Sequence, residues 1–89
     1  MIDVDQRGAL EAVERILNRG GEPKDVLRSV LEALHGRGVG FGAIRTGGEE
    51  LTVGAPGDAL TTSGALTMSA ADQAFVDRVA TLISPFVRD

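Results

Sequence analysis

The sequence predicts an α+β protein in which helices cover one face of a small antiparallel sheet. Three observations support this fold class. Apolar residues recur at helical spacing in three stretches, glycines alternate along the middle of the chain, and a turn signal follows them. The expected order is helix, helix, strand, strand, strand, helix. The simplest arrangement is a two-layer domain with the N- and C-terminal helices packed on the same face of the sheet.

Two helices are expected in the first part of the chain. The first covers residues 3–18 and ends at Gly20 and Gly21, because glycine readily takes the left-handed conformation that closes a helix. The second begins at Pro23, where the missing N–H costs no hydrogen bond, and ends at Gly36. Its apolar side is formed by Val26, Leu27, Val30, Leu31 and Leu34.

Residues 69–87 carry the widest apolar stripe and predict the third helix. Ser69 is the expected N-cap, with Asp72 three residues later as in a capping box. Pro85 should bend or end the helix, because it removes an internal hydrogen bond. The stripe consists of Phe75, Val76, Val79, Leu82, Ile83, Phe86 and Val87.

Glycine at every second position of residues 36–42 predicts a strand with one bare face. Something must approach that face closely, either a packed helix or a ligand or partner subunit. Residues 46–49, Thr-Gly-Gly-Glu, predict a hairpin turn into a second strand over residues 51–55. Residues 59–64 are expected to form a polar loop, and residues 65–68 a short third strand.

The composition is that of one ordinary globular domain covering residues 1–89. The chain is 43% hydrophobic and 25% charged, with a formal net charge of −4. Acidic residues are interleaved with the basic ones, so neither nucleic acid nor a membrane is an expected partner. No apolar run reaches the roughly 20 residues of a membrane span, and the N-terminus is acidic. We therefore expect a soluble, cytoplasmic protein.

No arrangement of residues predicts catalysis, a metal site or a cofactor. The chain lacks cysteine, which excludes thiolate nucleophiles and thiolate metal ligands. His35 is the only histidine, and in the last turn of a helix it is expected to contact the final carbonyl groups. The glycine run has neither the spacing nor the strand-to-helix context of a phosphate-binding loop.

The candidate binding residues lie on the bare strand face and in the polar loop. Polar loops on rigid sheets often carry binding sites, and they are also what any connection between strands looks like. The candidate ligand-binding residues are Gly40, Gly42, Asp58, Thr61, Thr62 and Ser63.

The order of these elements resembles the GAF family of small-molecule sensor domains. The resemblance covers the helix pair over residues 10–34, residues 39–45 with the hairpin after them, residues 50–54, and the final helical stretch 69–86. It implies an antiparallel sheet with terminal helices on one face, and often dimers formed through those helices. This chain is shorter than a usual member, and residues 56–64 are too few to enclose a cyclic nucleotide. The resemblance therefore implies a minimal GAF-like domain.

The sequence leads to two hypotheses on function. The first is a non-catalytic, stand-alone regulatory or interaction module that forms a homodimer through its helices. The alternative is a small-ligand sensor that binds a small molecule on the open sheet face, over Gly40, Gly42 and the loop 58–63.

Overall fold

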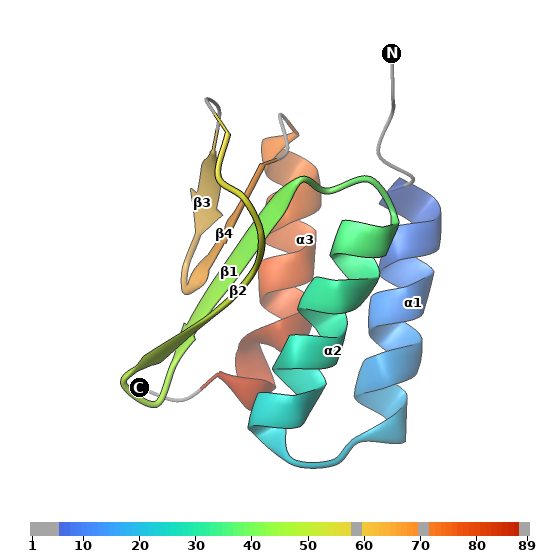
Figure 1. Cartoon of the computed structure of the whole chain (residues 1–89). Coiled ribbons are helices and arrows are strands. Elements are labelled where there is room, and N and C mark those ends of the chain that lie inside the picture. Colours follow the sequence, from blue (N-terminus) through green and yellow to red (C-terminus); the bar gives the residue numbers. More distant parts are fainter. Residues whose placement is uncertain (1–5, 58–59, 70–71, 88–89) are drawn as a thin grey trace.

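Three helices lie on one side of a four-stranded antiparallel sheet (Figure 1). The computed structural model describes residues 6–57, 60–69 and 72–87. Within them the α+β fold class and the helix-covered sheet are confirmed. The elements are α1 (Gln6–Arg19), α2 (Pro23–Gly36), β1 (Phe41–Thr46), β2 (Glu49–Gly54), β3 (Thr61–Ser63), β4 (Leu66–Met68), α3 (Gln73–Ile83) and the 3₁₀ turn η1 (Ser84–Phe86).

The strands lie in the order β2-β1-β4-β3, so β2 and β3 form the two edges of the sheet. Helix α2 packs on β1 and β2, and α3 packs on β3 and β4. Helix α1 packs against α2 and α3. The N-terminal helix therefore covers the other two helices, which in turn cover the sheet (Figure 1).

Local chemistry explains where α2 begins and where both of the first two helices end, whereas the predicted start of the first helix at residue 3 lies outside the described residues. Helix α2 starts at Pro23, as predicted, and is closed by hydrogen bonds from the backbone N–H groups of Arg37 and Val39 to the Leu34 carbonyl, each at 3.1 Å. Helix α1 is followed by Gly20 at φ 74° and Gly21 at φ 125°, a conformation that favours glycine. Both predicted stops are thus confirmed.

The predicted start of the third helix was wrong. Asp72 is the N-cap of α3, and its carboxylate accepts hydrogen bonds from the backbone N–H groups of Ala74 at 3.0 Å and Phe75 at 3.3 Å. The Ser69 hydroxyl instead accepts a hydrogen bond from the Phe41 N–H at 2.8 Å. Ser69 thereby extends the pairing of β1 with β4, so α3 begins later in the sequence, after Asp72. At the other end α3 gives way to η1 at Ser84, beside Pro85, as predicted.

The sheet has one more strand than predicted. Residues 59–64 were expected to form a loop, but Thr61–Ser63 pairs with Leu66–Met68 as a second hairpin. Gly64, at φ 58°, occupies the first turn position, where a two-residue turn of type II′ requires glycine. The first hairpin turns at Gly47 and Gly48, as predicted, and both residues have positive φ.

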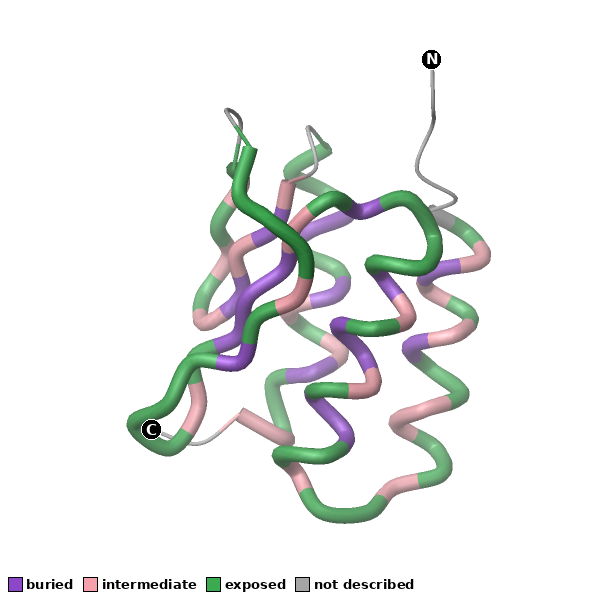
Figure 2. The backbone as a smooth tube through the Cα atoms, in the orientation of Figure 1, coloured by how far each residue is buried: buried purple, intermediate pink, exposed green. Residues whose placement is uncertain are grey.

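The two faces of the sheet differ sharply in composition. Residues opposite each other in an antiparallel pair share a face. The register therefore places Gly42 and Ile44 of β1 on the same face as Leu51 and Val53 of β2 and Leu66 and Met68 of β4. We call this the helix face, because α2 and α3 cover it and most of its residues are buried, as the colours of Figure 2 show. No polar or charged side chain of the described residues is buried.

Two glycines allow backbone and side chains to approach closely. A Cβ atom at Gly42 would lie 2.9 Å from the Leu31 Cδ2 atom of α2, so helix packing explains this glycine. A Cβ atom at Gly54, whose φ is 76°, would lie 2.1 Å from the Gly40 carbonyl oxygen. Gly54 therefore has both a conformational and a steric reason to be glycine.

Replacing Gly54 by alanine should destabilise the fold far more than the same change at Gly48. Gly48 has a similar φ of 79°, but nothing lies within 4 Å of an added Cβ atom. Gly48→Ala should cost about 1–2 kcal/mol from backbone strain alone. Gly54→Ala adds a backbone clash and should cost about 3–5 kcal/mol in urea unfolding. Equal losses in the two variants would contradict the close approach of Gly54 to Gly40.

Candidate binding surface

The structure does not bring the predicted binding residues together. Gly42 lies on the helix face beneath Leu31, so its predicted role on an open face was wrong. Gly40 is exposed, and a Cβ atom there would lie 3.2 Å from the Ser69 hydroxyl. The prediction at Asp58 lies outside the described residues. The remaining predicted residues, Thr61, Thr62 and Ser63, belong to β3.

The register of β3 separates its three residues between the two faces. Thr61 and Ser63 lie opposite Met68 and Leu66 and therefore on the helix face. Thr62 lies on the other face, where its hydroxyl is 3.2 Å from the Thr67 hydroxyl. The sheet thus stands between Thr62 and the side chains of its two neighbours.

Ser63 and Asp77 join β3 to α3. A hydrogen bond from the Ser63 hydroxyl, and a second from the Gln73 amide at 2.9 Å, lower the pKa of the Asp77 carboxyl from its ordinary value of 3.8. Both bonds favour the ionised carboxylate. Ser63 therefore has a structural partner, and it holds the short edge strand against the helix layer.

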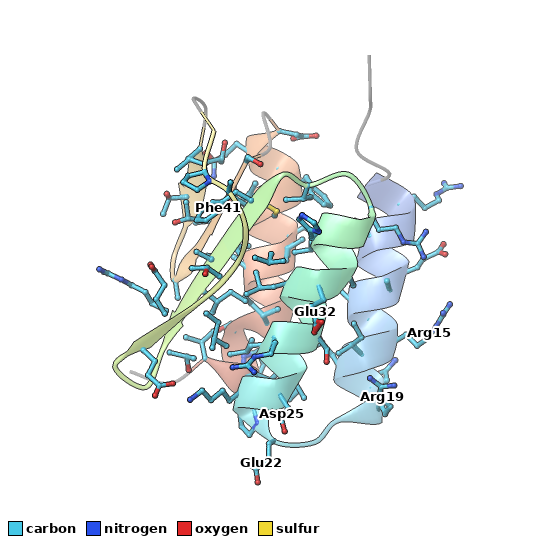
Figure 3. The ribbon with its side chains drawn as sticks, in the orientation of Figure 1. Arg15, Arg19, Glu22, Asp25, Glu32 and Phe41 are labelled. Carbon is cyan, nitrogen blue, oxygen red and sulfur yellow. The ribbon has the colours of Figure 1, made fainter. Side chains whose placement is uncertain are left out.

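We call the uncovered side of the sheet the open face. It carries the alternate residues of each strand, and the helices all lie on the opposite side (Figure 1). Phe41 marks it at one end of β1 (Figure 3). Strand alternation could have predicted these residues, had the sequence shown which side the helices cover. The open face consists of Phe41, Ala43, Arg45, Glu50, Thr52, Thr62 and Thr67.

A hollow lies at the end of the sheet where the first hairpin turns. It has a volume of about 600 Å³, and the turn at Gly47 and Gly48 forms part of its wall. Arg45 and Glu50 reach it from the open face, so its lining carries both charges. The complete lining is Arg45, Thr46, Gly47, Gly48, Glu49, Glu50, Ala65 and Val87. None of these residues was among the predicted binding residues, because a turn signal alone does not show what packs beside the turn.

A second hollow of about 290 Å³ runs between α2 and the edge strand β2. Arg28, Leu31 and Glu32 line it from the helix, and residues 50–53 line it from the strand. An ion pair between Lys24 and Glu49 also joins α2 to β2, and it is the main reason that the pKa of the Glu49 carboxyl lies below its ordinary value of 4.5. This hollow therefore lies beside the backbone groups of an edge strand.

Comparisons with known proteins add no relative. Neither the protein-family models, nor the curated proteins, nor the solved structures contain a match to this chain. Over the described parts of the chain, no helix has the length and apolar character needed to cross a membrane. The same residues contain no cluster of histidine and carboxylate side chains able to hold a metal ion.

Removing the Asp77 carboxylate should loosen β3 in a pH-dependent way. Because the pKa of Asp77 is lowered in the folded protein, its contribution is present above about pH 4 and disappears as pH falls through the folded pKa. At pH 7, Asp77→Ala should speed hydrogen exchange at the β3 amides, whereas Glu14→Ala on α1 should not. A stability difference from wild type that stays unchanged from pH 7 to pH 2 would contradict this role.

Proposed function

We propose that the protein is a non-catalytic regulatory or interaction module that acts as a homodimer in the cytoplasm. The main support for this proposal is that helices cover only one face of the sheet. Helices fill one face, whereas the open face and the six-residue edge strand β2 stay accessible. Uncovered strand edges and sheet faces are surfaces on which proteins receive other chains.

The electrostatics of the described residues support binding as the role of this fold. The carboxyl groups with shifted pKa values are Glu49 and Asp77. Each shift has a structural cause, an ion pair with Lys24 in one case and hydrogen bonds from Ser63 and Gln73 in the other. Shifted groups at catalytic sites are usually desolvated within a cleft, whereas these two are exposed.

The resemblance to GAF domains supports pairing through the helices. Helices α1 and α3 lie side by side, and apolar side chains along them are only half-buried. Leu10 and Leu17 of α1 and Leu82 of α3 belong to this group. Burying such residues in a partner would add stability that a domain of this size needs.

Light scattering should give twice the chain mass of 9.3 kDa at micromolar concentration. Dilution should then shift the mass toward the monomer, from which the dissociation constant follows. A mass of 9.3 kDa at every concentration, up to about 100 times the micromolar starting concentration, would contradict the homodimer.

A small-ligand sensor is the second candidate, and the hollow at the first hairpin favours it. Its volume of about 600 Å³ lies within the range of small-molecule sites. Arg45 and Glu50 offer a cation and an anion there, which suits a ligand that carries both charges. This site differs from the one that the sequence predicted, because it lies at the opposite end of β1 from Gly40.

Thermal-shift screening against nucleotides, amino acids and tetrapyrroles tests the sensor. A bound ligand at about 100 times its Kd should raise Tm by roughly 5 °C or more. Arg45→Ala should abolish the shift, whereas Arg78→Ala on α3 should leave it intact. Failure of every compound to stabilise the protein would contradict the sensor and leave the interaction module.

A further inference from the structure

Strand β2 is the long free edge of the sheet. Its six residues contrast with the three of β3 at the other edge. The Gly40 carbonyl accepts from the Ala55 N–H, whereas the Arg45 N–H donates to Ala65 on the β4 side. Along an antiparallel strand, successive residues direct their backbone hydrogen-bonding groups to opposite sides. Even-numbered residues of β1 therefore bond to their odd-numbered partners in β2, and odd-numbered residues of β1 face β4. Glu50 and Thr52 therefore direct their backbone N–H and C=O groups outward from the sheet.

Helix α2 runs beside this edge in the same direction as β2. The Lys24–Glu49 ion pair joins their starts. Further along, Leu31 lies over Gly42, the register partner of Val53, and the His35 Cδ2 atom would lie 3.0 Å from a Cβ at Gly54. Arg28 and Glu32, one helical turn apart, therefore flank the level of Thr52. Both line the hollow between α2 and β2, and Figure 3 shows Glu32 on the surface of α2.

We propose that a second copy of this chain pairs its β2 antiparallel with this β2, on a two-fold axis through Thr52. This inference rests on the proposed homodimer and assigns its surface to the strand edge in place of the helices. The two four-stranded sheets would become continuous. The side chains of Leu51 and Val53 would meet those of Val53 and Leu51 in the second copy, between the two α2 helices.

The charges on α2 and β2 favour a two-fold axis at Thr52 over an axis at Leu51 or Glu50. A two-fold axis at Thr52 places Arg28 opposite Glu32 of the second copy, and Glu32 opposite its Arg28. It also places Glu50 opposite Gly54, which carries no charge. An axis at Leu51 would bring Arg28 against Arg28, and an axis at Glu50 would bring Glu50 against Glu50; like charges directly opposite each other are destabilising.

The spacing also suits this pairing. Helix α2 packs on both β1 and β2, so it lies within about one strand spacing of the edge. Paired strands are about 4.8 Å apart, which would put the axes of the two α2 helices roughly 10 Å apart. This is the distance at which helices pack directly. Arg28 and Glu32 would then lie within reach of their counterparts.

Charge reversal at α2 tests the pairing without touching the core. Arg28 and Glu32 are both exposed. Arg28→Glu and Glu32→Arg should each weaken the dimer Kd about tenfold by light scattering, because each creates two like-charge contacts. The double variant should return to within about threefold of wild type. Arg15→Glu on α1 makes the same charge change on the side of α1 away from the sheet and should have no effect (Figure 3).

A substitution at the proposed axis provides an independent check. Thr52→Lys would place two positive charges opposite each other and should also weaken the dimer about tenfold. Thr62→Lys, on the open face of β3, is its matched control. A wild-type monomer would overturn both this inference and the proposed homodimer. A dimer insensitive to Thr52→Lys and to the charge reversals would overturn the strand-edge pairing alone and leave the helices as its surface.

Discussion

The contact between the Leu31 side chain and the backbone of Gly42 is the one on which the rest of this structure depends. A side chain at position 42 would occupy the space that the Leu31 Cδ2 atom fills, so the missing Cβ lets α2 lie close against β1. Helix α2 then covers β1 and β2, and α3 has β3 and β4 to cover. Helix α1 packs against the other two helices on their side away from the sheet, which keeps Ala9 and Val13 out of water.

This close packing determines which surfaces stay available for binding. Because α2 and α3 occupy the helix face, the apolar side chains of the sheet are used for folding. Apart from the half-buried Phe41 at one end, the open face carries charged residues and threonines, and its central Ala43 is small enough to be shielded by its neighbours, at 4% exposure. Binding at the hairpin hollow or along the β2 edge would therefore depend on polar groups and backbone hydrogen bonds more than on an exposed apolar patch.

The sequence predicted most elements because their signals are local. Helix α2 has a proline start, a clean apolar stripe and a glycine stop, and the first hairpin has its two-glycine turn. Strand β3 was missed because Thr61–Ser63 is short, polar and follows a loop, so its strand character comes from pairing with β4. Asp72 replaced Ser69 as the cap because the Ser69 hydroxyl bonds to Phe41, a contact 28 residues away that no local pattern contains.

The binding site was harder to predict than the fold for a related reason. Alternating glycines indicate that something lies on a bare strand face, but they do not distinguish a helix of the same chain from a ligand. At Gly42 the structure shows a helix of the same chain, because the Leu31 side chain of α2 fills the space beside the glycine. The edge position of β2 depends on the strand order, and the order follows from long-range pairing of β1 with both β2 and β4. The local sequence therefore did not mark Arg45, Glu50 and Thr52 as candidate binding residues.

The most direct test of the Leu31–Gly42 contact is a nuclear Overhauser measurement between the Leu31 δ-methyl protons and the Gly42 α-protons. The structure predicts strong cross-peaks between these groups, together with weaker ones from the same methyl groups to Val53 across the register. Cross-peaks from Gly42 to solvent-facing residues such as Thr52 or Thr67, with none to Leu31, would contradict the account, because they would place the bare strand face away from the helices.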